Sequence, residues 1–160
     1  MINWNAVRSS GIKFVSIKAS EGVTYTDPDF YANWIGAHAA GLTRTAYHFA
    51  HPSISAIDQA NYFVAAVTSA GGYAHNTSTM QLMLDLESTD GLEPPAVWSW
   101  VQAFMGHLQN LTGRPGIIYT VRGKPLKVAC FHTALVLTHA HTHTHFSSHT
   151  KTLGILFLER

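Results

Sequence analysis

The sequence has one cysteine, no long apolar run and few charged side chains. Because Cys130 is alone, no disulfide framework can form within the chain. No apolar stretch approaches the roughly 20 residues that a membrane-spanning helix needs, so we expect no membrane partner. Charged residues make up 12% of the chain and apolar residues 46%, which is typical of a globular protein with a real core. This composition excludes a disordered chain and a small protein held together by disulfides.

A basic segment followed by an apolar segment, as in a secretory signal peptide, is also missing at the N-terminus. Met1 is followed directly by Ile2, Asn3 and Trp4. We therefore expect that this chain carries no signal peptide and that it begins within a folded region.

Charge divides the chain into two segments. Residues 1–120 carry five basic and eight acidic side chains, a net charge of −3, which is not basic enough to predict a nucleic-acid partner. Residues 121–160 carry five basic side chains and one acidic side chain, a net charge of +4, and six of the eleven histidines lie after residue 130. This shift predicts two segments of different origin or role, divided near residue 120.

Within residues 1–120, apolar strands alternate with amphipathic helices. Strands are predicted over residues 14–19, 43–49, 81–86 and 116–120, and helices follow that open near residues 30, 55 and 94. This order is typical of an α/β fold in which crossover helices connect parallel strands. Residues 121–160 do not continue this order, and we expect an irregular, disordered or poorly packed tail there.

Two carboxylates lie on the third predicted strand. Asp85 and Glu87 are two residues apart in an apolar run, so they project to one face with Cα atoms about 6.5 Å apart. Charges are costly to bury unless they are paired, hydrogen-bonded or used in chemistry. Taken alone, the pair fits either a structural ion pair at a strand end or the acid pair of a glycosidase, and its spacing does not choose between retention and inversion.

Other polar and aromatic side chains also lie at the carboxyl ends of predicted strands, which form the ligand side of a parallel sheet. They are Lys18, Glu21, Tyr47, His48 and Tyr119. Glu21 fits a sugar cleft or a surface turn, and Lys18 fits charge neutralisation in the cleft or a structural pair. Either tyrosine fits sugar stacking or core packing. We interpret His48 as structural rather than catalytic.

A succession of motifs along residues 2–120 resembles glycoside hydrolase family 25, the lysozymes that act as N-acetylmuramidases. The longest, over residues 11–22, reads GIKFVSIKASEG and is similar to the family's G-I-K-F-V-x-I-K-A-T-E-G. The other motifs include INW at residues 2–4, DPDF at 27–30, AYHF at 46–49, LDLE at 84–87, TGR at 112–114 and IIYT at 117–120.

This resemblance implies a fold, a reaction and a set of site residues. The fold would be a partial (β/α) barrel of the TIM-like type, with about four parallel strands, crossover helices and an irregular C-terminal tail. The reaction would be hydrolysis of the β-1,4 bond between N-acetylmuramic acid and N-acetylglucosamine in peptidoglycan. Glu87 would be the general acid and Asp85 would assist it. Glu21, Tyr47, Tyr119 and Lys18 would bind substrate.

The remaining expectations follow from the same resemblance. We expect no cofactor and no metal, glycan strands of peptidoglycan as the partner, a monomer, and an extracellular site of action. A run of four histidines between residues 139 and 145 would fit a metal site on one strand face, or be accidental.

Three departures from the family pattern leave a second hypothesis open. The family's first strand would precede Ile2, its later strands would follow Thr120, and Thr45 stands where the family usually has glycine. Residues 1–120 would then be an incomplete catalytic domain, and residues 121–160 a His-rich tail of unrelated sequence. The codons for Val121 and Arg122 can match a splice-donor consensus, so a retained intron would explain such a tail. The alternative to an active enzyme is an inactive truncated relative that only binds glycan, or a product of mis-splicing.

Overall fold

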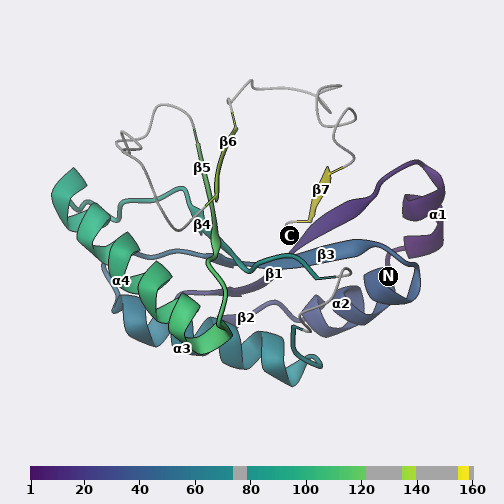
Figure 1. The fold of residues 1–160 in the computed structure, drawn as a ribbon, viewed down its shortest axis with the longest axis horizontal. Helices are drawn as coiled ribbons and strands as arrows, with labels where there is room; N and C mark the ends of the chain where they lie inside the picture. Colours follow the sequence, from purple (N-terminus) through teal and green to yellow (C-terminus); the bar gives the residue numbers. More distant parts are fainter. Residues whose placement is uncertain (74–78, 122–134, 140–154, 159–160) are drawn as a thin grey trace.

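The structure is a computed structural model that describes residues 1–73, 79–121, 135–139 and 155–158. Figure 1 shows a curved sheet with helices packed along one face. The helices are α1 (Trp4–Ser9), α2 (Phe30–Ala39), α3 (Ala56–Ser69) and α4 (Pro94–Thr112). The strands are β1 (Phe14–Glu21), β2 (Tyr25–Thr26), β3 (Thr43–Phe49), β4 (Met83–Leu86), β5 (Ile117–Val121), β6 (Leu135–His139) and β7 (Ile155–Leu158).

The four predicted strands form the centre of the sheet. They are β1, β3, β4 and β5, and each pairs in parallel with the next. The predicted α/β architecture with crossover helices is therefore confirmed. The sequence did not predict that β1 continues to Glu21 and turns into the short antiparallel strand β2.

The tail supplies two further strands that the sequence did not predict. β6 pairs in parallel with β5, and β7 pairs in parallel with the first half of β1. The sheet order is thus β2-β1-β3-β4-β5-β6, with β7 beside β1. Among the strands that the structure describes, no pairing joins β6 to β7, so a closed barrel is not formed by them.

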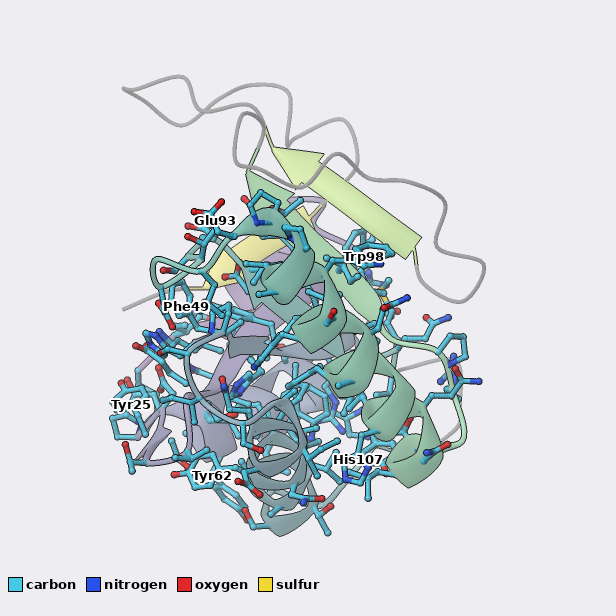
Figure 2. The ribbon with its side chains drawn as sticks, turned by 90° about the vertical axis from the view of Figure 1, so that its left-hand side faces the viewer. Tyr25, Phe49, Tyr62, Glu93, Trp98 and His107 are labelled. Atoms are coloured by element: carbon cyan, nitrogen blue, oxygen red, sulfur yellow. The ribbon has the colours of Figure 1, made fainter. Side chains whose placement is uncertain are left out.

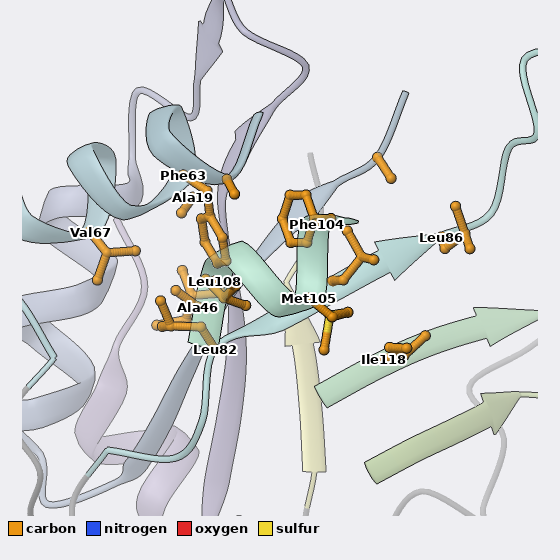
Figure 3. Packing of buried hydrophobic residues seen from close by; sticks show 14 of the residues in the cluster. Ala19, Ala46, Phe63, Val67, Leu82, Leu86, Phe104, Met105, Leu108 and Ile118 are labelled. Carbon is orange, nitrogen blue, oxygen red and sulfur yellow. The ribbon is translucent and has the colours of Figure 1, made fainter. Parts of the chain in front are cut away.

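The main hydrophobic core lies between the sheet and its helices (Figure 3). Alternate residues of the strands, such as Ala46 and Leu84, face Phe63 of α3 and Phe104 and Leu108 of α4. All five side chains are fully buried. Burial of each large apolar side chain contributes roughly 1.5–3 kcal/mol, so this face carries much of the fold's stability.

Local signals in the sequence explain where the longer helices begin and end. The Ser55 hydroxyl accepts a hydrogen bond from the Asp58 amide and caps α3. Pro94 is the first residue of α4, and Gly113 ends that helix with φ +69°. None of the helices in the described residues has the length and apolar character for crossing a membrane.

The opposite face of the sheet holds a smaller cluster. Tyr47, Met83 and Ile117 are buried there, and Tyr119 packs against them. Thr45 lies on the same face, and its hydroxyl donates a 2.6 Å hydrogen bond to the carbonyl of Gln81. The Thr45 side chain is therefore buried on this face with its hydroxyl hydrogen-bonded.

Candidate active site

The two candidate catalytic carboxylates lie at the carboxyl end of β4, on the face turned away from the helices. Asp85 is 3% exposed, and Glu87 is half-buried and follows the last residue of the strand. The backbone here is held from both sides. The Ala50 amide donates to the Asp85 carbonyl at 2.9 Å, and the Thr120 hydroxyl donates to the Leu86 carbonyl at 2.9 Å. The position of the acid pair is therefore set by β3 and β5 together.

Aromatic side chains flank Asp85 across the sheet. In the parallel register Asp85 lies beside Phe49 of β3 and Tyr119 of β5. Tyr47 lies two residues before Phe49 on β3. It is 1% exposed and packs against Met83. Of the two interpretations for Tyr47, packing in the core describes its position here, whereas Tyr119 is half-buried at the level of Asp85.

The predicted substrate-binding residues Lys18 and Glu21 form an ion pair with each other. Their Nζ and Oε2 atoms are 2.8 Å apart. The Lys18 ammonium also lies 5.2 Å from the Phe49 ring centroid and 5.7 Å from that of Tyr25, within the range of cation–π contact. Figure 2 shows Tyr25 and Phe49 along the same side of the molecule. Lys18 therefore neutralises an acid at the strand ends, and that acid is Glu21.

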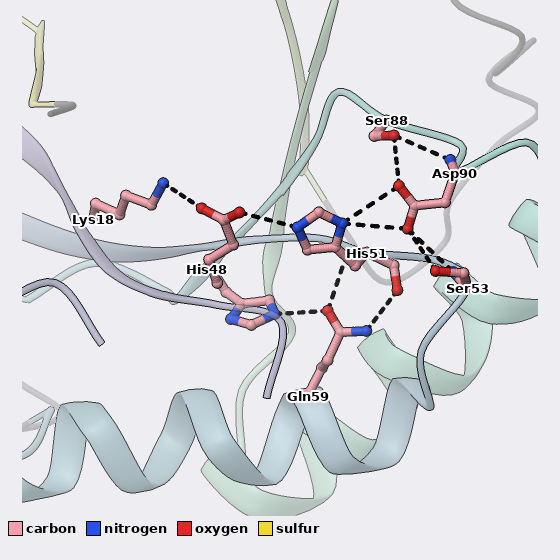
Figure 4. A network of polar contacts seen from close by, with 8 residues as sticks. Lys18, His48, His51, Ser53, Gln59, Ser88 and Asp90 are labelled. Carbon is pink, nitrogen blue, oxygen red and sulfur yellow. Dashed lines mark hydrogen bonds and ion pairs between the residues drawn. The ribbon is translucent and has the colours of Figure 1, made fainter. Parts of the chain in front are cut away.

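His51 and Asp90 belong to the same polar cluster and were not among the predicted site residues (Figure 4). His51 Nε2 lies 3.0 Å from Glu21 Oε1, and Nδ1 lies 3.3 Å from Asp90 Oδ2. A usable signal was the position of His51 just beyond the carboxyl end of β3. Asp90 and Gly91 form a turn dipeptide three residues after Glu87, which was a second signal.

The charges of this cluster support one another. Hydrogen bonding to Glu21 raises the pKa of His51, against a smaller opposing effect of burial, and Asp90 adds to the rise. Burial alone would raise the pKa of Glu21, but the hydrogen bonds from His51 and Lys18 outweigh it and lower that pKa. Burial likewise opposes the hydrogen bonds from Ser88 and Ser53, which together lower the pKa of Asp90.

His48 lies on the helix-facing side of β3, away from the acid pair. Its Nδ1 is 2.9 Å from the Ser20 hydroxyl and its Nε2 is 3.0 Å from Gln59 Oε1. Because the Gln59 amide nitrogen donates to the carbonyls of His51 and Ile54, Gln59 Oε1 is an acceptor and His48 Nε2 carries the proton. Burial lowers the pKa of His48 to about 4, so the side chain is neutral at pH 7. This placement matches the structural interpretation of His48.

No group of three or more His, Cys, Asp or Glu side chains in the described residues is arranged to hold a metal ion. The histidine run between residues 139 and 145 falls outside the described residues, apart from the backbone of His139, so the metal hypothesis for it stays untested.

The arrangement at the end of β4 is suited to proton transfer. One carboxylate is buried and a second lies two residues away, half-buried, in an otherwise apolar strand. Desolvation and like-charge repulsion both favour keeping a proton on one member of such a pair. A carboxylic acid that keeps its proton near neutral pH is what a general acid requires.

Comparison with known proteins gives a consistent result. Residues 1–125 match the family model described as glycosyl hydrolases family 25. The chain is 37% identical over 126 residues to lysozyme M1 of Streptomyces globisporus, covering 74% of this chain and 42% of that protein. It is 37% identical over 125 residues to an N,O-diacetylmuramidase of Arthroderma benhamiae, covering 74% of this chain and 52% of that protein.

The solved structures agree. A muramidase from Trichobolus zukalii superposes with a TM-score of 0.70 at 39% identity, covering 76% of this chain and 60% of that chain. The family resemblance predicted from the sequence motifs is thereby confirmed. The chain spans about half the length of the curated relatives that it matches.

Proposed function

The chain belongs to glycosyl hydrolases family 25, and from this premise we propose that it hydrolyses the β-1,4 bond between N-acetylmuramic acid and N-acetylglucosamine in peptidoglycan. The observation that carries the proposal is the buried Asp85 with Glu87 two residues on, at the carboxyl end of a parallel strand. Carboxylates in this position lie on the side of a parallel sheet where ligands bind.

In the proposed mechanism Glu87 protonates the glycosidic oxygen of the leaving sugar. Glu87 is half-buried, so it can meet substrate while part of its surroundings stays apolar. Asp85 is buried beside it and helps to keep that proton in place before reaction. As positive charge develops on the sugar ring, the Asp85 carboxylate orients and stabilises it.

Residues around the acid pair would contact the substrate. Tyr119 flanks Asp85, and its half-buried ring offers a surface for a sugar. Glu21 and Lys18 lie at the end of β1 as a neutralised pair, which presents hydrogen-bonding groups without a net charge. Tyr47 contributes by packing in the buried cluster that supports Tyr119. Peptidoglycan lies outside the cell membrane, so the proposed site of action is extracellular, and the proposed acting species is a monomer.

The test is clearance of a bacterial wall suspension, followed as loss of turbidity. We expect the wild-type chain to clear the suspension and Glu87→Gln to be inactive while remaining folded. Glu93→Gln is the matched control, because Glu93 is exposed at the start of α4 (Figure 2). Equal activity of wild type and Glu87→Gln would remove Glu87 as the acid. Inactivity of both, with binding to walls retained in a pull-down, would favour a glycan-binding relative.

A further inference from the structure

His51 connects three segments at the carboxyl edge of the sheet. It lies just beyond the end of β3, it reaches Glu21 at the end of β1 through Nε2, and it reaches Asp90 in the β4–α4 loop through Nδ1 (Figure 4). The preceding amide, Ala50 N–H, donates to the Asp85 carbonyl. The segment that carries His51 therefore contacts both sides of Glu87 along the chain: Asp85 before it and Asp90 after it.

The two contacts of His51 require a particular protonation state. A neutral imidazole has a single N–H and could donate to only one carboxylate, with a lone pair facing the other. Donation to both Glu21 and Asp90 needs the imidazolium, and its position 32% exposed between two carboxylates favours that charge. Other charged or titratable groups near it are Lys18, beyond Glu21, and neutral His48, joined through Gln59.

Asp90 has a positive φ, a backbone conformation that few residues other than glycine adopt, although Asn and Asp adopt it more often than most. Its φ is +47°, in the left-handed region, where a residue with a Cβ is strained. Three groups besides His51 hold it there: the Ser88 hydroxyl donates to Oδ1 at 2.7 Å, and the Ser53 amide and hydroxyl donate to Oδ2 at 3.2 and 3.0 Å. These contacts converge on the Asp90 carboxylate and fix the turn that follows Glu87.

We propose that His51 is a positioning residue for Glu87, acting as a cationic bridge that ties the turn carrying Asp90 to the ends of β1 and β3. The inference rests on the proposed function, because it assigns His51 a role toward the general acid of that reaction. His51 does not touch the reacting atoms in this role. It keeps Glu87 in register by holding the segment immediately after it.

The consequence is a loss of turnover without a comparable loss of binding. In His51→Gln the side chain cannot bridge two carboxylates, so the turn keeps only its hydrogen bonds to Ser88 and Ser53 and is loosened, and Glu87 samples positions away from the scissile bond. Displacement of a catalytic group by about 1 Å can cost up to roughly 100-fold in rate, so we expect kcat to fall about 10- to 100-fold with KM within about twofold. Asp90→Asn should give a similar loss, and the double variant should be no worse than either single variant.

The pH dependence provides a second signature. As pH rises through the pKa of His51, the imidazolium becomes neutral and one of its two contacts is lost. Wild type should therefore lose protection of the Asp90 and Leu92 amides against hydrogen exchange between pH 6 and pH 9, once the intrinsic exchange rates are divided out. Both amides are hydrogen-bonded within the turn, to Ser88 Oγ and the Thr89 carbonyl.

The experiment combines hydrogen exchange of these two amides with kinetics in wild type, His51→Gln, Asp90→Asn and His38→Gln. His38 is exposed on α2, does not belong to the cluster, and serves as the control. We expect low protection at both pH values in the two cluster variants, a pH-dependent loss in wild type and in His38→Gln, and unchanged protection in the core of β3. Unchanged protection of Asp90 and Leu92 in His51→Gln, or a uniform loss across the whole chain, would overturn the proposal.

The exchange measurement also separates this proposal from the proposed function. If wild type does not hydrolyse walls, the proposed function fails, yet the exchange data still decide whether His51 holds the turn. If wild type is active and His51→Gln releases the turn without lowering kcat, the positioning role is wrong while the glycosidase assignment stands.

Discussion

His48 and His51 lie three residues apart at the end of β3, but their surroundings shift their pKa values in opposite directions. His48 faces the helices, stacked 5.6 Å from Phe104 and tilted 5.4 Å from Phe63, and burial lowers its pKa to about 4. His51 lies at the open edge between two carboxylates, which raise its pKa. One residue type thus serves as a neutral core group and as a cation because its surroundings differ.

A single side chain joins the two environments. Gln59 Oε1 accepts from His48 Nε2 and from the His51 amide, so the same α3 residue satisfies the buried His48 ring and anchors the backbone of the half-buried His51. Stability and chemistry are thus divided: around His48 the helix-covered face is sealed and uncharged, and the strand-end edge holds the network of paired charges.

The largest expected effect is on the sealed face. Phe104→Ala removes a fully buried ring that packs on His48 and Trp100, and should lower the free energy of unfolding by about 3–5 kcal/mol. Urea denaturation measures this, with Leu111→Ala, exposed on the same helix, as a control within about 0.5 kcal/mol of wild type. A loss below about 1 kcal/mol for Phe104→Ala would mean that this face does not carry the stability.

The second prediction concerns acid and the neutral state of His48. Its folded pKa of about 4 lies below the ordinary value of 6.5, so the unfolded chain binds the proton first as pH falls. The contribution of His48 is therefore full above pH 6.5 and is lost as pH falls toward 4, by about 3 kcal/mol in total. We expect His48→Gln to remove this part of the acid sensitivity, measured as the change in unfolding free energy between pH 7.5 and pH 4. An acid sensitivity equal in the two proteins would contradict it.

The strand β3 and the strand β4, with Asp85 on it and Glu87 directly after it, could both be predicted from the sequence. The strand over residues 43–49 was predicted with the bounds of β3, since this segment lies between Gly41, which ends the preceding helix, and the Pro52 turn. The position of Asp85 and Glu87 at the end of one strand was also predicted, because two carboxylates in an apolar run form a local pattern. Local spacing was sufficient for that position, whereas the assignment of the two residues as a catalytic acid pair came from the family resemblance.

The edge network was not predicted, for a physical reason. His51 meets Glu21 and Asp90 over separations of 30 and 39 residues, and only the register of three parallel strands brings them together. No local pattern marks such contacts. The strands β6 and β7 were missed for a related reason: the sequence of the tail shows no helix caps or helical stripes, and only their pairing with β5 and β1 defines them.

A smaller effect is expected on the face opposite the helices. Thr45→Val keeps the shape of the side chain but leaves the Gln81 carbonyl without the hydroxyl that donates to it at 2.6 Å. The free energy of unfolding should fall by about 1–2 kcal/mol, with Thr68→Val, exposed on α3, as the control. If Thr45→Gly were instead more stable than wild type, Thr45 would be crowding this face, and the hydrogen bond would not compensate for its bulk.

The smallest expected effect belongs to the charged edge, where exposed pairs contribute roughly 0.2–1 kcal/mol each. Glu21 and Asp90 have lowered pKa values, so their contribution is present above their ordinary values of 4.5 and 3.8 and is lost as pH falls further. His51 has a raised pKa, so its contribution is full below 6.5 and is lost as pH rises through the folded value. The stability difference between wild type and Asp90→Asn should therefore be largest between about pH 4.5 and 6.5 and should shrink by pH 9 and in 1 M salt. Asp58→Asn, on α3 outside the network, is the control and should show no such maximum. If the stability difference for Asp90→Asn stayed constant from pH 5 to 9, Asp90 would act through its turn geometry alone and not through the charge of His51.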